Sequence, residues 1–205
     1  MEAHRIAVIT GASQGLGKAF AEDCASRGYS LVLVALPGTG LPELARGLEA
    51  NHGIECLVME EDLTLPERRS QIVESVLGRF GRIELLINNA GIGQNGLFDL
   101  LPYEIQRKTI ELNVQATMQL SYALLPRLAI PSPEGKCGRI LTVASLAAFY
   151  PMPLFAVYAA TKAFLLHFSL ALRHGVAALG VSVSALCPGG VITSEELREK
   201  VKWQS

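Results

Sequence analysis

Short runs of hydrophobic residues recur along the chain, and each has the length of a buried strand. Six runs are continuous rather than alternating, which is typical of parallel strands covered on both faces. The segments between them have the length and pattern of helices. The predicted strands are residues 6–9, 30–36, 54–59, 84–87, 139–143 and 181–186, and the predicted helices are 15–27, 41–52, 66–80, 102–128 (with a possible break) and 157–179.

This repeated alternation of strand and helix predicts an α/β protein. Because crossovers between parallel strands are right-handed, the expected architecture is a Rossmann-type doubly wound parallel sheet flanked by helices. The chain has 205 residues, which suits one well-packed domain, and it contains no internal repeat or linker. We therefore expect residues 1–205 to form a single domain.

Composition narrows the class of protein. Half of the residues are hydrophobic, which excludes a disordered chain. The net charge of −1 argues against a nucleic-acid partner, because binding to phosphates needs an excess of Lys and Arg. Residues 140–160 carry no charged side chain, but Pro151 and Pro153 interrupt them, so we predict no membrane span. The four cysteines are widely spaced, which predicts reduced thiols in a cytoplasmic protein and no metal site.

The turn after the first strand has the composition of a phosphate-binding loop. Glycines 11, 15 and 17 allow a tight turn and close approach of a pyrophosphate to the backbone. The turn follows a strand and opens a helix, which is the context that such a loop requires. The spacing is G-x-x-x-G-x-G, and Ser13, Gln14 and Leu16 occupy the positions between the glycines.

A second cluster of candidate chemistry lies near the predicted fifth strand. Tyr158 and Lys162 are four residues apart in a helical segment, so both side chains share one face. An ammonium about 4 Å away would lower the tyrosine pKa from about 10 toward neutrality, where a phenol can transfer protons. Ser145 follows the fifth strand and can hydrogen-bond a substrate carbonyl.

These motifs together resemble the short-chain dehydrogenase/reductase (SDR) family along nearly the whole chain. Asn113, Ser145, Tyr158 and Lys162 match the family's catalytic residues in order and spacing. The segment from Thr10 to Gly17 resembles its cofactor loop. The other matching positions are Asp62 and Leu63 after strand three, Asn88-Asn89-Ala90-Gly91 after strand four, and Pro188-Gly189-Gly190-Val191-Ile192-Thr193 after strand six.

The resemblance implies an NAD(P)-dependent oxidoreductase that transfers a hydride between nicotinamide and a ketone or secondary alcohol. It implies that Tyr158 moves the proton and that Asn113 holds the helix geometry and a water linked to Lys162. The implied cofactor-binding residues are Gly11, Ser13, Gln14, Gly15, Leu16, Gly17, Leu36, Asp62, Leu63, Asn89, Ala90, Gly91, Tyr158, Lys162, Pro188, Gly189, Val191 and Thr193.

The choice between NAD and NADP stays open in the sequence. An acidic residue that selects NAD is expected at the end of strand two, about 20 residues into the unit. This chain has Leu36 there, followed by Pro-Gly-Thr-Gly, with no acid and no arginine. Gln14 stands at a loop position that is often basic in NADP-using relatives.

Apolar and small residues around the catalytic positions indicate a hydrophobic substrate, such as a fatty-acyl, steroid or aromatic carbonyl. The alternative is that several of them only line the core. They are Ile92, Gly93, Leu146, Ala147, Phe149, Pro151, Pro153 and Phe155. The helical segments 114–128 and 159–172 are apolar nearly all round and need cover beyond the sheet. In the family that the chain resembles, these two helices form a dimer face, so the resemblance implies a homodimer or homotetramer.

The sequence ends at Ser205, where SDR relatives continue with a substrate lid and a seventh strand. We therefore expect a sheet that lacks this C-terminal part. One alternative is a catalytically silent dinucleotide-binding or scaffold protein. The missing C-terminal part argues for it, and the intact set of catalytic residues argues against it. Another is an epimerase or dehydratase of the extended relatives, for whose substrate domain the chain is too short.

Overall fold

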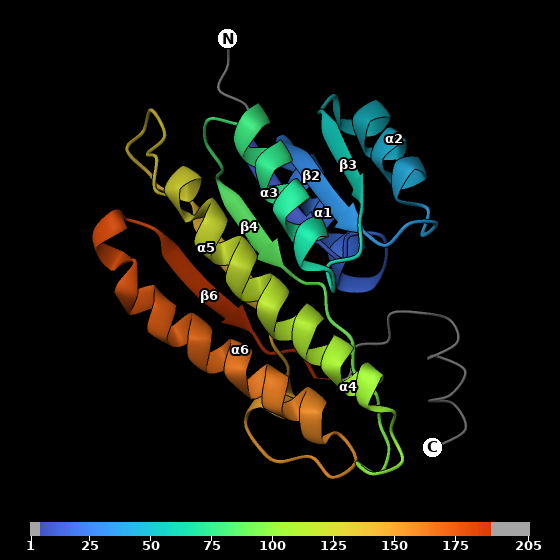
Figure 1. Ribbon diagram of the computed structural model, residues 1–205. Coiled ribbons are helices and arrows are strands. Elements are labelled where there is room, and N and C mark those ends of the chain that lie inside the picture. Colours follow the sequence, from blue (N-terminus) through green and yellow to red (C-terminus); the bar gives the residue numbers. More distant parts are fainter. Residues whose placement is uncertain (1–4, 190–205) are drawn as a thin grey trace.

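The computed structural model describes residues 5–189, and its centre is a six-stranded sheet in which all neighbouring strands are parallel. The strand order is β3-β2-β1-β4-β5-β6 (Figure 1). The predicted doubly wound α/β fold is therefore confirmed. The strands are β1 (Arg5–Thr10), β2 (Tyr29–Ala35), β3 (Cys56–Glu60), β4 (Leu85–Asn88), β5 (Arg139–Val143) and β6 (Ser182–Leu186).

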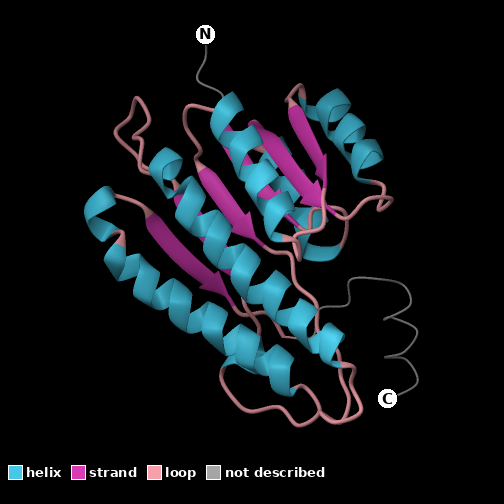
Figure 2. Cartoon of the chain, viewed as in Figure 1, coloured by secondary structure: helices cyan, strands magenta, loops and turns pink. Residues whose placement is uncertain are grey.

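Helices cover both faces of this sheet. In Figures 1 and 2 the helices α3, α5 and α6 lie in front of the strands, and α1 lies behind them. Short 3₁₀ turns at Leu146–Ala148 and Ala177–Leu179 flank α6. The helices are α1 (Gly15–Ser26), α2 (Leu41–His52), α3 (Pro66–Arg79), α4 (Tyr103–Ile110), α5 (Thr117–Leu128) and α6 (Ala156–Gly175).

The core has two layers because successive strand residues point to opposite faces. Val8 belongs to the layer under α3 and α5, with Leu86 and Leu120, whereas Ile9 belongs to the layer under α1 and α2, with Leu33. Each of these side chains is fully buried. Burying one stabilises the fold by about 1.5–3 kcal/mol, which explains why the strands read as continuous apolar runs.

The predicted helix at 102–128 changes its winding in the middle. A π-helical segment, Glu111–Ala116, joins α4 to α5 and contains Asn113. Single π-helical turns of this kind are rare and occur mostly at functional sites. The possible break predicted from sequence is therefore a local widening of a continuous helix, and it presents Asn113 to the loop that follows β4.

The strand order reverses at β1, which lies between β2 and β4. In open parallel sheets, ligands bind in the crevice beside the carboxyl ends of the strands at such a point. Within residues 5–189, no helix combines the length and the hydrophobicity that a membrane span needs. The expectation of a missing C-terminal strand and lid concerns positions beyond residue 189 and lies outside the described part of the chain.

Candidate active site

The turn between β1 and α1 is shaped by its glycines. Gly11 and Gly15 have φ of 64° and 54°, a region that favours glycine. A Cβ atom on Gly17 would lie 1.9 Å from the carbonyl oxygen of Gly11, so only glycine lets the helix approach the turn this closely. Helix α1 starts at Gly15 with no side-chain cap at Gln14 and no acidic residue in its first turn. Its first backbone N–H groups are therefore left for an anion.

Thr10 and Asn89 fasten this turn to the end of β4. The Asn89 amide nitrogen Nδ2 donates to the carbonyl oxygens of Thr10 (2.9 Å) and Gly11 (3.1 Å). The Thr10 hydroxyl accepts from the backbone N–H groups of Asn89 and Ala90, both at 3.0 Å, and donates to the carbonyl of Ile87. The predicted glycine turn and the Asn-Asn-Ala-Gly segment thus form one hydrogen-bonded wall at the carboxyl ends of β1 and β4.

Asn113 joins this wall to α6. Its side chain is fully buried (0% exposed) and exchanges two hydrogen bonds with the backbone of Ile92, both at 2.9 Å. Its Nδ2 also donates to the hydroxyl of Thr161 at 2.9 Å, and that hydroxyl donates to the carbonyl of Tyr158 at 2.7 Å. Asn113 therefore fixes the position of the loop after β4 relative to the start of α6.

Lys162 is almost completely buried, with 5% of its surface exposed. Its ammonium donates to the carbonyl of Val143 at 2.9 Å and lies 5.7 Å from the centre of the Tyr158 ring. A Cβ atom on Gly91 would lie 3.3 Å from Nζ, so Gly91 makes room for the ammonium. The expected pairing of Tyr158 and Lys162 on one helix face is present, and the described contacts turn Nζ toward β5.

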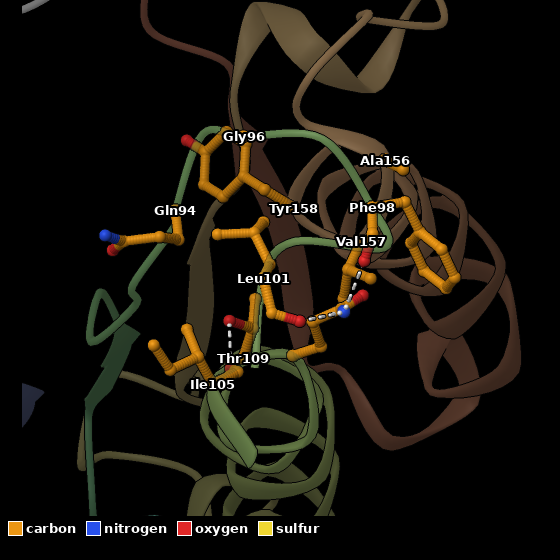
Figure 3. Close-up of a pocket in the computed structure, with 10 residues that line it drawn as sticks. Gln94, Gly96, Phe98, Leu101, Ile105, Thr109, Ala156, Val157 and Tyr158 are labelled. Atoms are coloured by element: carbon orange, nitrogen blue, oxygen red, sulfur yellow. Dashed lines mark hydrogen bonds between the residues drawn. The ribbon is translucent and has the colours of Figure 1, made fainter. Parts of the chain in front are cut away.

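Tyr158 projects from the first turns of α6 and packs against the loop after β4. A Cβ atom on Gly93 would lie 2.4 Å from its ring, so the ring needs a glycine there. Phe155 packs edge-on against it at 6.0 Å. In Figure 3 the Tyr158 ring lies at the same end of a small pocket as Gln94, with Ile105 at the opposite end.

Ser145 lies at the carboxyl end of β5 and caps the 3₁₀ turn that follows. Its hydroxyl oxygen accepts from the N–H of Ala147 at 3.1 Å, which leaves the hydroxyl hydrogen to donate elsewhere. The next residue, Leu146, donates its N–H to the carbonyl of Pro188 at 2.9 Å. The loops after β5 and β6 are thereby held side by side, with Pro188 and Gly189 beside Leu146 in the 3₁₀ turn.

The remaining predicted cofactor positions follow β2 and β3 or lie outside the described residues. Leu36 is exposed, Leu63 is buried, and the carboxylate of Asp62 accepts from the N–H of Thr64 at 2.8 Å. Of the apolar residues predicted to line a pocket, Ala147 is buried, whereas Ile92, Leu146 and Phe149 are exposed. Val191 and Thr193 lie beyond the described part.

Two contacts of this region were missed by sequence reasoning. The hydroxyl of Thr161 accepts a hydrogen bond from Asn113 and donates one to the carbonyl of Tyr158, so it links the two residues. A threonine three residues after a predicted site residue on a helix is a usable signal for such a bond. The buried guanidinium of Arg69 donates to the carbonyl of Leu63 at 3.0 Å and pairs with Glu111 at 3.2 Å. No sequence pattern distinguishes Arg69 from the other arginines of its helix.

Burial lowers the pKa of Lys162 from its usual 10.5 to about 8, against a smaller opposing electrostatic effect of the Cys187 side chain. The unfolded chain binds this proton more tightly than the folded protein does. The burial of the charged Lys162 therefore lowers the free energy of unfolding by its full amount below about pH 8, and this loss disappears as the pH rises to about 10.5. The stability of Lys162→Met relative to the wild type should therefore fall by about 2–3 kcal/mol between about pH 7 and 10.5. Urea unfolding of both proteins across this range measures it. If the stability of Lys162→Met relative to the wild type stayed constant or rose with pH, the burial of a titrating ammonium would be contradicted.

Comparison with known proteins gives a consistent result. A family model described as short chain dehydrogenase matches residues 5–204. The 3-oxoacyl-[acyl-carrier-protein] reductase FabG of Salmonella typhimurium is 32% identical over 189 residues, which cover 92% of this chain and 74% of that protein. A short-chain dehydrogenase from Sphingobium yanoikuyae, solved with NADPH, is 36% identical with a TM-score of 0.84 and covers 92% of this chain and 72% of its own.

A further solved structure extends the range of chemistry among the similar proteins. It is the L-sorbose reductase from Gluconobacter frateurii complexed with NADPH and L-sorbose. It is 34% identical, has a TM-score of 0.87, and covers 98% of this chain and 75% of its own. The proteins similar to this chain are thus named for substrates as different as an acyl group on a carrier protein and a sugar.

Proposed function

The chain belongs to the short-chain dehydrogenase family, and on that premise we propose that it transfers a hydride between NAD or NADP and a ketone or secondary alcohol. The observation that supports this most strongly is the convergence of Asn113, Ser145, Tyr158 and Lys162. They come from the π-helical segment, the loop after β5, and α6. Asn113 is hydrogen-bonded to the loop after β4, Ser145 to the N–H of Ala147, and Lys162 to the last carbonyl of β5. Both solved relatives described above contain NADPH.

The crevice fits a dinucleotide. The uncapped start of α1 can receive a pyrophosphate, because its free N–H groups and its dipole favour an anion. When bound, the nicotinamide supplies or accepts the hydride. We assign the pyrophosphate to Gly11, Ser13, Gln14, Gly15, Leu16 and Gly17, the adenosine part to Leu36, Asp62 and Leu63, and the nicotinamide side to Asn89, Ala90, Gly91, Tyr158, Lys162, Pro188 and Gly189.

The catalytic roles follow from what each side chain can donate. The hydroxyl of Tyr158 gives a proton to the substrate oxygen during reduction and takes it back during oxidation. Ser145 has its hydroxyl hydrogen free and donates it to the same oxygen. The ammonium of Lys162, held in a buried position by Val143, stabilises negative charge that develops on the tyrosine oxygen. Asn113 acts through Ile92 and Thr161 as a positioning residue.

The substrate class follows from the surface around Tyr158. Large apolar side chains of the loops after β4 and β5 are exposed, among them Phe149 and also Phe98, which lines a pocket with Tyr158. The two loops are joined by a hydrogen bond from the N–H of Gly96 to the carbonyl of Leu154 at 2.9 Å. A carbonyl compound with a hydrophobic chain or ring would bury this surface, so we favour such a substrate over a sugar.

We also propose that the protein forms a homodimer or homotetramer and works in the cytoplasm. Tyr122 on α5 is 82% exposed, and Met118, Phe164 and Leu170 on α5 and α6 are also exposed. Exposed apolar side chains on two helices favour a homodimer or homotetramer through this face. Light scattering at micromolar concentration measures the mass, and a monomer would contradict the assembly. All four cysteines are free, which fits a reducing cytoplasm.

A spectrophotometric screen tests the proposed function. The protein is mixed with NADH or NADPH and a panel of ketones and aldehydes with aliphatic, aromatic and sugar-like groups, and the absorbance of the reduced nicotinamide is followed. The expected result is oxidation of the cofactor with a hydrophobic carbonyl and a weaker rate with a sugar-like one. No turnover by folded protein, with either cofactor and in either direction, would contradict the proposal.

A further inference from the structure

The loop that should choose between the two cofactors carries no charge of its own. An acid at the end of β2 normally binds the ribose 2′-hydroxyl of NAD and excludes the 2′-phosphate of NADP. Here Leu36 occupies that place and is 53% exposed, and the loop through Gly40 has no ionisable side chain. The turn after β1 offers only the neutral Gln14 nearby. Any electrostatic selection must therefore come from another element.

The neighbouring strand supplies a carboxylate to this loop. Glu60 is the last residue of β3 and pairs in register with Ala35, the last residue of β2. The N–H of Gly38 donates to Oε1 of Glu60 at 3.0 Å. Gly38 has φ of 73°, so the backbone turns at the point where this bond forms. Among residues 5–189, Oε2 of Glu60 has no hydrogen-bond partner and remains able to accept one.

The charge of Glu60 is not neutralised by its surroundings. The ion pairs of this region join Glu61 to Arg68 (3.6 Å) and Glu43 to Arg46 (2.8 Å). None of the ion pairs within residues 5–189 includes Glu60. Because successive strand residues point to opposite faces, Glu61 lies on the α3 side of the sheet and Glu60 on the α2 side. The loop after β2 therefore meets one unpaired, half-buried negative charge.

We infer that Glu60, a residue of β3, directs cofactor choice toward NAD by repelling the 2′-phosphate of NADP and accepting a hydrogen bond from the 2′-hydroxyl of NAD. This inference rests on the proposed function, since it concerns the same crevice. It sets the chain apart from the two solved relatives that hold NADPH. The selecting carboxylate comes from the strand next to β2, so it is not found by inspecting the residues at the end of β2.

Calorimetric titration with NAD⁺, NADP⁺, 5′-ADP and 2′,5′-ADP tests this inference without turnover. The wild type should bind NAD⁺ at least about tenfold more tightly than NADP⁺, and 5′-ADP more tightly than 2′,5′-ADP. The Glu60→Gln variant keeps an acceptor for the Gly38 N–H but loses the charge, so its affinity for both 2′-phosphorylated ligands should rise by about tenfold. The matched control Glu61→Gln removes the same charge from the opposite face and should leave the ratio within about twofold.

Ionic strength separates repulsion from a merely structural role. Salt screens charge, so the NAD⁺/NADP⁺ affinity ratio of the wild type should fall as salt rises, whereas that of Glu60→Gln should change little. Wild-type protein that binds NADP⁺ as tightly as NAD⁺ would overturn the inference and leave the proposed function intact. An equal effect of the two variants would do the same. Failure of folded protein to bind any of the four ligands would overturn both.

Discussion

Replacing Tyr158 by phenylalanine is expected to lower turnover by about 10³-fold, the usual scale of a lost general acid or base. The ring contacts with Gly93 and Phe155 involve carbon atoms, so the variant keeps its packing and loses only the hydroxyl. Steady-state rates of the wild type and Tyr158→Phe with the same carbonyl substrate measure the effect.

Two controls distinguish lost chemistry from lost structure. The Tyr158→Phe variant should bind the nicotinamide cofactor and unfold in urea like the wild type. The matched variant Tyr103→Phe removes a hydroxyl from an exposed tyrosine at the start of α4 and should keep its rate. If Tyr158→Phe retained more than about a tenth of wild-type turnover, Tyr158 would not be the proton donor.

The second large effect is expected on stability. A Cβ atom on Gly17 would lie 1.9 Å from the Gly11 carbonyl oxygen and 2.6 Å from the Asn89 amide, so Gly17→Ala must push α1 away from the glycine turn. Overpacking costs about 1–3 kcal/mol, and a contact this short with backbone atoms that cannot rotate away places the cost at the upper end, about 3 kcal/mol. Urea unfolding should show this loss, and nucleotide binding should weaken with it because the turn and the helix start form one site.

Helix α2 offers the matched control. Gly47 lies within α2 and a Cβ atom there meets nothing within 4 Å. Gly47→Ala should therefore stabilise the protein by about 0.5–1 kcal/mol through helix propensity alone. A Gly17→Ala variant as stable as the wild type would mean that the close approach of α1 to the turn does not exist in solution.

Much of the fold was predictable because the burial of a segment determines which residue types it contains. A strand covered on both faces must be apolar along its length, and Val8 and Ile9 in β1 point to opposite layers yet are both fully buried. The ends of strands were less predictable. The third strand ends at Glu60 rather than at residue 59, and that one residue decides which carboxylate faces the loop after β2.

The site was predictable where chemistry depends on spacing within one element. Tyr158 and Lys162 share a helix face because they are four residues apart. The surroundings of the π-helical segment were not predictable, since its Asn113 exchanges hydrogen bonds with the backbone of Ile92, 21 residues away. The contact between Glu60 and Gly38 depends on the register of two strands, which hydrophobic runs do not report.

Transfer of deuterium tests the central claim most directly. The protein is incubated with a hydrophobic ketone and reduced cofactor carrying deuterium at C4 of the nicotinamide, in ordinary water, and the alcohol is examined by mass spectrometry. Hydride transfer predicts one deuterium on the carbinol carbon, with the hydroxyl proton coming from water by way of Tyr158. An alcohol without deuterium, from cofactor labelled on either face of C4, would contradict it.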